Sequence, residues 1–199
     1  MCMKKIIILI ILLLVGGALF WLFNNQLAIK NEFGKRAFQD QKYQNAINIF
    51  TEVLSKDKNN QDAYFFRGAT YSARQEWEKC ISDFSTVISL NSKYSNYSNA
   101  YWSRGYCYAN SGVLSEAIDD YTRSLELGTN FTALVYENRA KAYLNNLQID
   151  EAEKDWRTVL QLDPNNTMAR EALEAITQAK TDPNYDPKLF LDSTKNKKY

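Results

Sequence analysis

The fold is decided by residues 100–127, which read AYWSRGYCYANSGVLSEAIDDYTRSLEL and predict two amphipathic helices with a turn at Ser111–Gly112. Apolar residues recur in each helix at the i, i+3, i+4 and i+7 spacing of one helix face. The two stripes are Tyr101, Arg104, Gly105 and Tyr108, then Leu114, Ala117, Ile118, Tyr121 and Leu125. Gly105 and Ala117 are the smallest residues of these stripes, so we expect the two backbones to approach closely there. Neither helix alone buries its stripe, which predicts that the hairpin packs against neighbouring helices.

The composition is that of a folded, helical chain. Of the 199 residues, 45% are hydrophobic and 24% are charged, which is typical of a globular domain and not of a disordered one. Only seven glycines and three prolines favour helices over a turn-rich β fold. The net charge of +1 gives no global electrostatic reason to expect nucleic acid as a partner.

The amino terminus is an uncharged apolar run, IIILIILLLVGGALFWLF, from Ile6 to Phe23. Eighteen helical residues span roughly 27 Å, close to the hydrocarbon thickness of a bilayer. We therefore predict that residues 1–26 form a signal anchor or transmembrane helix, with Trp21 at the membrane interface. The small residues at 15–18 leave open a cleavable signal peptide.

Positive charges near this run favour one orientation. Lys4 and Lys5 precede it and predict a cytoplasmic amino end, with the folded domain on the extracytoplasmic side. Lys30, Lys35 and Arg36 follow the run and compete with that orientation.

The hairpin recurs along the chain with a period near 34 residues. Gly34 and Gly68 are 34 positions apart, and Gly105 and Ala140 are 35 apart. One helical hairpin per period resembles the tetratricopeptide repeat family. The matching positions are Tyr64, Gly68, Tyr71, Cys80, Phe84 and Val87, then Tyr101, Gly105, Tyr108, Ala117, Tyr121 and Ser124, then Tyr136, Ala140, Tyr143, Ala152, Trp156 and Val159.

This resemblance implies an all-α fold, a right-handed superhelical solenoid of about four helix hairpins that follows one transmembrane helix. The expected repeats span residues 27–60, 61–94, 98–131 and 133–166 within the region 27–166. Residues 167–180 are amphipathic and predict a capping helix. Residues 181–199 have no usable period and predict a mobile tail, with Leu189–Leu191 as a candidate docking patch.

Motifs for catalysis are missing from the sequence. The chain has no histidine, which removes the usual Ser-His, Cys-His and imidazole–metal arrangements. The acidic pairs Asp119-Asp120 and Glu151/Glu153 fall on expected second helices and indicate a solvated outer face. We expect no enzyme activity, cofactor, metal or small-molecule substrate.

Cys80 and Cys107 have two readings. They pair in a disulfide if the domain lies outside the cytoplasm. The reading that we favour is that Cys80 is a compact apolar filler at the small-residue position of its repeat.

In tetratricopeptide proteins the first helices of successive repeats line a concave groove that holds a segment of a partner. The resemblance therefore implies a protein or peptide partner and a set of groove positions. These partner-binding candidates are Asn31, Lys35, Phe38, Phe65, Ser72, Trp102, Tyr106, Glu137 and Lys141. We expect the aromatic members to be free of the inter-helix core and Trp102 to be the main anchor. The alternative, that some aromatics pack on a neighbouring repeat, stays open.

The predicted function is a membrane-anchored scaffold that binds a partner segment in this groove, for tethering or assembly at the membrane. The alternative is a secreted or periplasmic accessory domain of an envelope enzyme or polymer system, released by signal cleavage. The basic and Asn clamp that chaperone-binding members use for a terminal carboxylate is not expected, because only scattered polarity stands at its positions. The sequence does not identify the partner.

Overall fold

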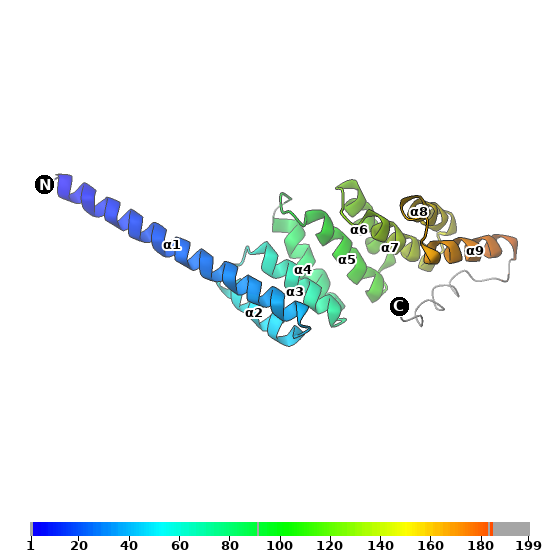
Figure 1. Ribbon diagram of the computed structural model, residues 1–199, viewed down its shortest axis with the longest axis horizontal. Coiled ribbons are helices and arrows are strands. Elements are labelled where there is room, and N and C mark those ends of the chain that lie inside the picture. The colour runs from blue at the N-terminus through cyan, green and yellow to red at the C-terminus, as the bar shows by residue number, and fades with distance from the viewer. Residues whose placement is uncertain (1, 91, 183, 185–199) are drawn as a thin grey trace. The chain divides into compact units, whose positions relative to one another are not determined.

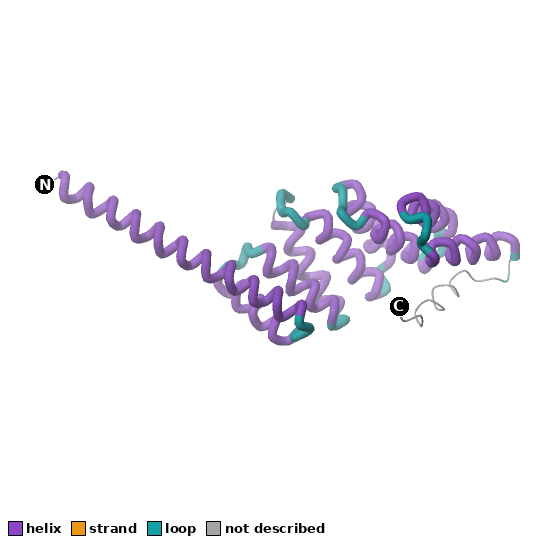
Figure 2. Tube along the Cα trace, in the orientation of Figure 1, coloured by secondary structure: helices purple, strands orange, loops and turns teal. Residues whose placement is uncertain are grey.

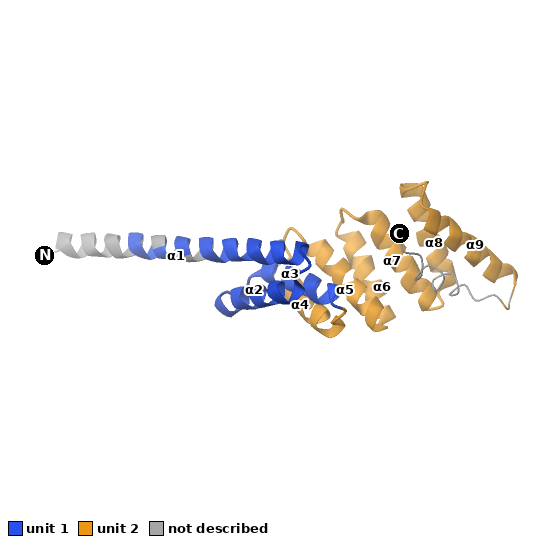
Figure 3. Ribbon diagram, turned by 60° about the horizontal axis from the view of Figure 1, so that its bottom comes forward, with its two compact units in different colours: residues 1–74 blue, residues 75–199 orange. Residues whose placement is uncertain are grey.

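The computed structural model describes residues 2–90, 92–182 and 184, without the side chains of residues 2–13, 18, 20, 23 and 24. The described residues form helices and no strands (Figure 1, Figure 2). The helices are α1 (Cys2–Gln39), α2 (Tyr43–Lys56), α3 (Gln61–Ala73), α4 (Trp77–Leu90), α5 (Tyr97–Ser111), α6 (Leu114–Glu126), α7 (Thr132–Asn145), α8 (Ile149–Leu162) and α9 (Thr167–Thr181). Residues 1–74 form one compact unit and residues 75–199 a second (Figure 3). The all-helical repeat architecture is confirmed.

In the first unit, α2 packs against the carboxyl-terminal part of α1, and α3 contacts both helices. The closest approach is at Gly34, where an added Cβ would lie 2.5 Å from Cε1 of Phe50. Phe50 is fully buried in a cluster with Leu27, Ala37 and other apolar side chains. Gly34 is therefore a packing residue, because any side chain there would displace the Phe50 ring.

In the second unit, each helix from α4 to α9 packs against the next one along the chain. At Gly105 an added Cβ would lie 3.0 Å from the ring of Tyr121 and 3.1 Å from the backbone oxygen of Ala117. The close approach predicted for Gly105 and Ala117 is confirmed. Burial of the Tyr121 phenol raises its pKa well above the ordinary value.

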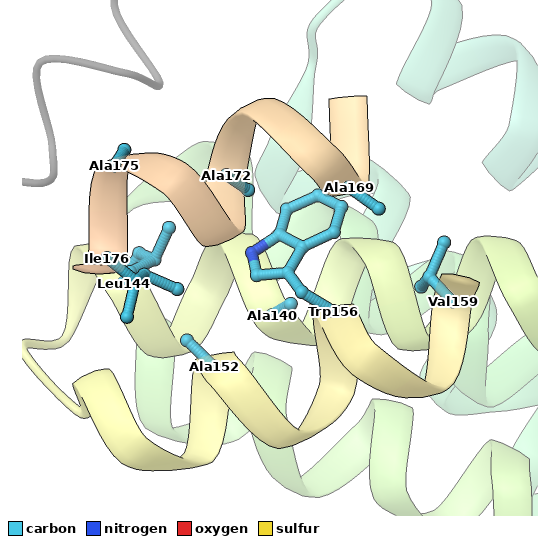
Figure 4. Close-up of a cluster of buried hydrophobic side chains, with 9 residues drawn as sticks. All are labelled: Ala140, Leu144, Ala152, Trp156, Val159, Ala169, Ala172, Ala175 and Ile176. Carbon is cyan, nitrogen blue, oxygen red and sulfur yellow. The ribbon is translucent and has the colours of Figure 1, made fainter. Parts of the chain in front are cut away.

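Helix α9 covers the carboxyl-terminal end of the second unit. Its N-cap is Asn166, whose Oδ1 accepts a 2.8 Å hydrogen bond from the backbone N–H of Ala169. Trp156 of α8 lies between the ribbons of α8 and α9, beside Ala172 (Figure 4). Leu144 joins the same cluster and is fully buried, so it has no free surface for a partner.

Most side chains of the predicted membrane segment, and the predicted patch at residues 189–191, lie outside the described residues. Within the part of the chain that is described, no helix is long and apolar enough to cross a membrane.

The expectation that the acidic pairs lie on a solvated outer face is wrong for Asp120. Its carboxylate is 5% exposed and accepts two hydrogen bonds from Arg104, from Nε and Nη2, each 2.8 Å long. Asp155 receives the same bidentate pair from Arg139, also at 2.8 Å. Asp119, next to Asp120, is exposed as expected. Helices α6 and α8 thus each carry one buried carboxylate that pairs with an arginine of the preceding helix.

Burial and pairing act in opposite directions on the Arg104–Asp120 pair. Burial raises the pKa of the Asp120 carboxyl above its ordinary value, although Arg104 attracts the carboxylate. Burial is the largest single influence on Arg104 and lowers its pKa, but the hydrogen bonds to Asp120 and the charge of that carboxylate, with smaller contributions from Tyr108 and Tyr101, together leave the pKa raised. The bidentate geometry favours the charged pair at neutral pH.

Candidate partner-binding surfaces

The first candidate surface lies on α1 and α3, which contact each other in the first unit. Lys35 stands at its centre, with Nζ 2.9 Å from Glu32 Oε1 and 3.2 Å from Asp62 Oδ2. The same ammonium lies 4.8 Å from the ring centroid of Phe66. Burial lowers the pKa of Lys35, but the bonds to Glu32 and Asp62 outweigh it and leave the pKa raised. Two carboxylates thus already neutralise this predicted contact.

Asn31 serves the interior of this unit. It is 6% exposed, and its Nδ2 donates a 3.0 Å hydrogen bond to Oδ1 of Asn60. The Asn60 oxygen also accepts the backbone N–H of Ala63, which caps α3. Asn31 therefore ties α1 to the start of α3 and leaves little side chain for a partner.

The remaining candidates of the first unit are partly buried. Phe38 packs on the Phe50 cluster and lies 6.1 Å, between centroids, from the ring of Tyr43. Phe65 meets Phe66 edge to face at 5.5 Å. Ser72 is half-buried on the same helix. The expectation that the groove aromatics are free of the core is wrong for Phe38, because its ring covers the α1–α2 contact.

The second candidate surface lies on α5 and α7, which contact each other in the second unit. Trp102 of α5 lies 5.5 Å, between ring centroids, from Phe131, which precedes the first residue of α7. It also packs on the cluster that contains Tyr121 and Val135. Its indole N–H is buried without an acceptor among the described residues. Trp102 is thus partly a core residue, contrary to expectation, because it closes the junction between successive hairpins.

Tyr106 is the most accessible of the predicted aromatics. It is 40% exposed, with its ring 6.3 Å from that of Trp77 in an edge-on arrangement. Phe131 and Leu134, at the start of α7, are 46% and 39% exposed. Sequence reasoning missed these two, because neither stands at a position that the repeat pattern uses. Together they extend the apolar surface around Trp102.

Glu137 and Lys141 complete the predicted set on α7. Lys141 Nζ lies 2.6 Å from Glu137 Oε1, one helical turn away. Each groove lysine therefore has an internal carboxylate partner, in both units. Neither surface therefore presents an uncompensated lysine, and both carry aromatic side chains.

The favoured reading of Cys80 as an unpaired apolar filler is wrong, because the residue is paired. Cys80 of α4 and Cys107 of α5 form a disulfide, with Cα atoms 6.3 Å apart. Both residues are fully buried. The bond links the second helix of one repeat to the first helix of the next.

No group of three or more metal-ligating side chains occurs among the residues that the structure describes. Several of the described acidic residues are instead paired with arginine or lysine, as at Asp120 and Glu137.

Comparisons with known proteins define the class. Residues 133–166 match the tetratricopeptide repeat family. No curated protein sequence matches the chain. The chain therefore contains a tetratricopeptide repeat and has the helical fold of proteins built from such repeats.

Solved structures support this fold at low sequence identity. YrrB, a TPR protein with an unusual peptide-binding site, aligns with a TM-score of 0.67 and 17% identity, over 82% of this chain and 81% of YrrB. MamA aligns with a TM-score of 0.71 and 20% identity, over 78% of this chain and 82% of MamA. The first TPR of Spaghetti (RPAP3), bound to the HSP90 peptide SRMEEVD, aligns with a TM-score of 0.54 and 21% identity, over 61% of this chain and 96% of the Spaghetti chain.

Proposed function

We propose that this protein is a non-enzymatic scaffold, held at a membrane by residues 1–26, that binds segments of a partner protein on its first-helix surfaces. Tetratricopeptide folds bind peptides in YrrB and in the Spaghetti complex. The observation that carries the proposal is the exposed apolar surface of Tyr106, Phe131 and Leu134 on α5 and α7. Exposed aromatic side chains at a helix junction are typical recognition residues.

The proposed partner is an apolar or aromatic segment without a required negative charge. Lys35 and Lys141 are neutralised by carboxylates of the same surface. An acidic peptide would have to displace these pairs and would gain little from doing so. This separates the proposed specificity from that of carboxylate-clamp proteins.

Anchoring and location are part of the same proposal. Eighteen uncharged residues precede the repeats and are long enough to cross a bilayer. The Cys80–Cys107 disulfide supports a domain on the oxidising, extracytoplasmic side. Carbonate extraction should leave the full chain in the membrane, and external protease should remove the folded domain from spheroplasts. Release by carbonate would contradict the anchor, and protection from protease would reverse the orientation.

The binding surface is tested by capture of partners from solubilised membranes on the full chain. We expect Tyr106→Ala to lower the affinity by about tenfold or more, because an exposed aromatic anchor contributes more than 1 kcal/mol. The matched control is Asp119→Ala, at an exposed position on α6. Equal recovery of every partner by both variants would move the site away from α5 and α7.

A further inference from the structure

The chain leaves its last helix, α9, beside the end of α7, in the second unit. Helices α7, α8 and α9 are joined by short turns, so α9 runs in the same direction as α7. Nζ of Lys180, in the last turn of α9, lies 2.7 Å from Oδ1 of Asp150, in the first turn of α8. Ile176 of α9 and Leu144 of α7 belong to one buried cluster (Figure 4). The carboxyl-terminal tail therefore starts beside the carboxyl-terminal end of α7.

The first part of the tail is a spacer, residues 182–188, which separates α9 from the apolar triplet Leu189-Phe190-Leu191. The backbone is extended at Asp182, which caps α9 with φ of −118° and ψ of 109°. Pro183 and Pro187 cannot continue a helix and favour an extended chain. Residues 185–199 lie outside the part of the chain that the structure describes.

The length of the spacer matches the length of α7. Its seven residues span about 22 Å when extended, at roughly 3.1 Å per residue. Helix α7 has 14 residues and is about 21 Å long. A spacer that runs back along α7 thus brings the triplet to the start of this helix. Phe131 and Leu134 lie there and are exposed, and the ring of Phe131 is 5.5 Å from that of Trp102.

The tail also matches this surface in chemistry. The triplet is apolar and uncharged, so it leaves the Lys141–Glu137 pair of α7 intact. Acidic residues outnumber basic ones over residues 75–184. In the rest of the tail the excess is basic, with Lys188, Lys195, Lys197 and Lys198 against Asp186 and Asp192. A basic tail is attracted to an acidic unit, which favours docking on its own chain.

We propose that Leu189–Leu191 dock on Tyr106, Phe131 and Leu134 of the same chain, so that the tail competes with a partner for this surface. The competition rests on the proposed function, because the partner is taken to bind the same residues. A short tether holds the triplet at an effective concentration of about 1 mM. A Kd of about 0.3 mM for the untethered segment then fills the surface roughly three-quarters of the time. The surface is open for the remaining quarter, which weakens a competing ligand about fourfold.

Intramolecular cysteine cross-linking of the full chain in detergent micelles tests the docking. In a Cys2→Ser background, Leu191→Cys is combined with Leu134→Cys at the start of α7. The matched control combines Leu191→Cys with Leu162→Cys, an exposed position at the end of α8, level with the start of α7. Under mild oxidation we expect at least fivefold more intramolecular disulfide from the first pair, measured by mass spectrometry of the digested monomer. Equal yields from the two pairs, or disulfide-linked dimers as the main product, would overturn the proposal.

Binding of a synthetic peptide measures the competition without cross-links. The probe is a fluorescein-labelled peptide of residues 182–199, titrated with the full chain. We expect the variant Leu189→Ser, Phe190→Ser, Leu191→Ser to bind this peptide about fourfold more tightly than the wild type, because its own tail no longer competes. The matched control Ser193→Ala, Thr194→Ala should bind the peptide like the wild type. Equal affinities of the triple variant and the wild type would overturn the proposal.

Failure of the docking and failure of the proposed function give different results. A tail that does not dock, together with partner capture that Tyr106→Ala lowers, would overturn the docking and leave the partner site on α5 and α7. A tail that cross-links to Leu134→Cys, together with partner capture that Tyr106→Ala leaves unchanged, would support the docking and contradict the partner site.

Discussion

The hairpins α5/α6 and α7/α8 share one charged network but differ in the residues around it. In each, an arginine of the first helix makes a bidentate pair with an aspartate of the second, Arg104 with Asp120 and Arg139 with Asp155. Each arginine also binds a hydroxyl of the preceding helix, of Ser85 at 3.0 Å in the first case. The two guanidinium groups lie between two tyrosine rings of their own helix, at centroid distances of 5.3–5.7 Å. The constant element of the repeat is therefore polar.

The variable elements are the helix contact, the turn and the inner face. The contact is Gly105 with Tyr121 in one hairpin, whereas Ala140 and Trp156 share one cluster in the other. The inner face is the side of the first helices on which the candidate groove residues lie. On it α5 carries Trp102, and the equivalent position of α7, 35 residues later, is Glu137. The arginine network is thus the same in both hairpins, whereas the apolar residues around it differ. The predictions below break these elements one at a time.

The largest effect is expected at the helix contact. Gly105→Leu should lower the free energy of unfolding by about 3 kcal/mol or more, because even a Cβ meets the Tyr121 ring and a backbone oxygen at 3.0–3.1 Å. Urea unfolding of the full chain measures it. Ala140→Gly in the other hairpin should cost only about 1 kcal/mol, from helix propensity and a small cavity. Wild-type stability in the Gly105 variant would show that the α5–α6 contact yields without strain.

Next in size is the arginine network. Asp120→Ala and Asp155→Ala should each cost about 2–3 kcal/mol, because each leaves a largely buried guanidinium without its counter-charge. Equal costs in the two hairpins would sharpen the comparison, since the pairs have the same geometry. Asp119→Ala is the matched control and should change the free energy of unfolding by less than about 0.5 kcal/mol, as expected for an exposed position. A similar loss in the control would contradict the buried-pair explanation.

These residues show why the sequence predicted one half of the fold better than the other. Small residues on facing stripes located the Gly105–Ala117 contact, because close packing needs them at that spacing. Asp120 was missed because an acidic pair on an amphipathic helix usually faces water, and only one member does here. A signal was present, since Arg104 stands on the buried stripe and requires a counter-charge. The 16-residue interval from Arg104 to Asp120 recurs from Arg139 to Asp155.

The candidate surface was predicted less well, for a different physical reason. The family positions located the helices that form it. They did not show that Lys35 is neutralised by Asp62, 27 residues away. Nor did they show that Trp102 reaches Phe131 across the junction of two hairpins. Contacts between residues this far apart in the sequence depend on how successive hairpins pack against each other. The sequence pattern of a single repeat does not specify that packing.

The inner face gives the third prediction. Trp102→Ala should cost about 1–2 kcal/mol of unfolding free energy, less than a fully buried tryptophan, because part of the ring contacts solvent. Its counterpart Glu137→Ala removes an i, i+4 ion pair and should cost about 0.5 kcal/mol or less. Thermal melts followed by circular dichroism compare the two variants. If the Trp102 variant melts at the wild-type temperature, Trp102 does not stabilise the fold and is a free binding anchor as first predicted.

The smallest effect is expected at the turns within the hairpins. In each hairpin one residue of the turn adopts the left-handed conformation: Gly112, directly after α5, with φ of +87°, and Leu147, two residues after the end of α7, with φ of +61°. Glycine adopts this conformation without a Cβ clash, whereas leucine pays about 1 kcal/mol in steric energy. Leu147 is 67% exposed, so its side chain contributes little packing that would be lost.

Leu147→Gly should therefore stabilise the protein by about 0.5–1 kcal/mol, or roughly 2–3 °C in the melting temperature. The reciprocal variant Gly112→Leu should destabilise it by a similar amount, because nothing lies within 4 Å of an added Cβ and only the backbone conformation opposes the change. A Leu147→Gly variant less stable than wild type would mean that the Leu147 side chain, and not the backbone, dominates this turn.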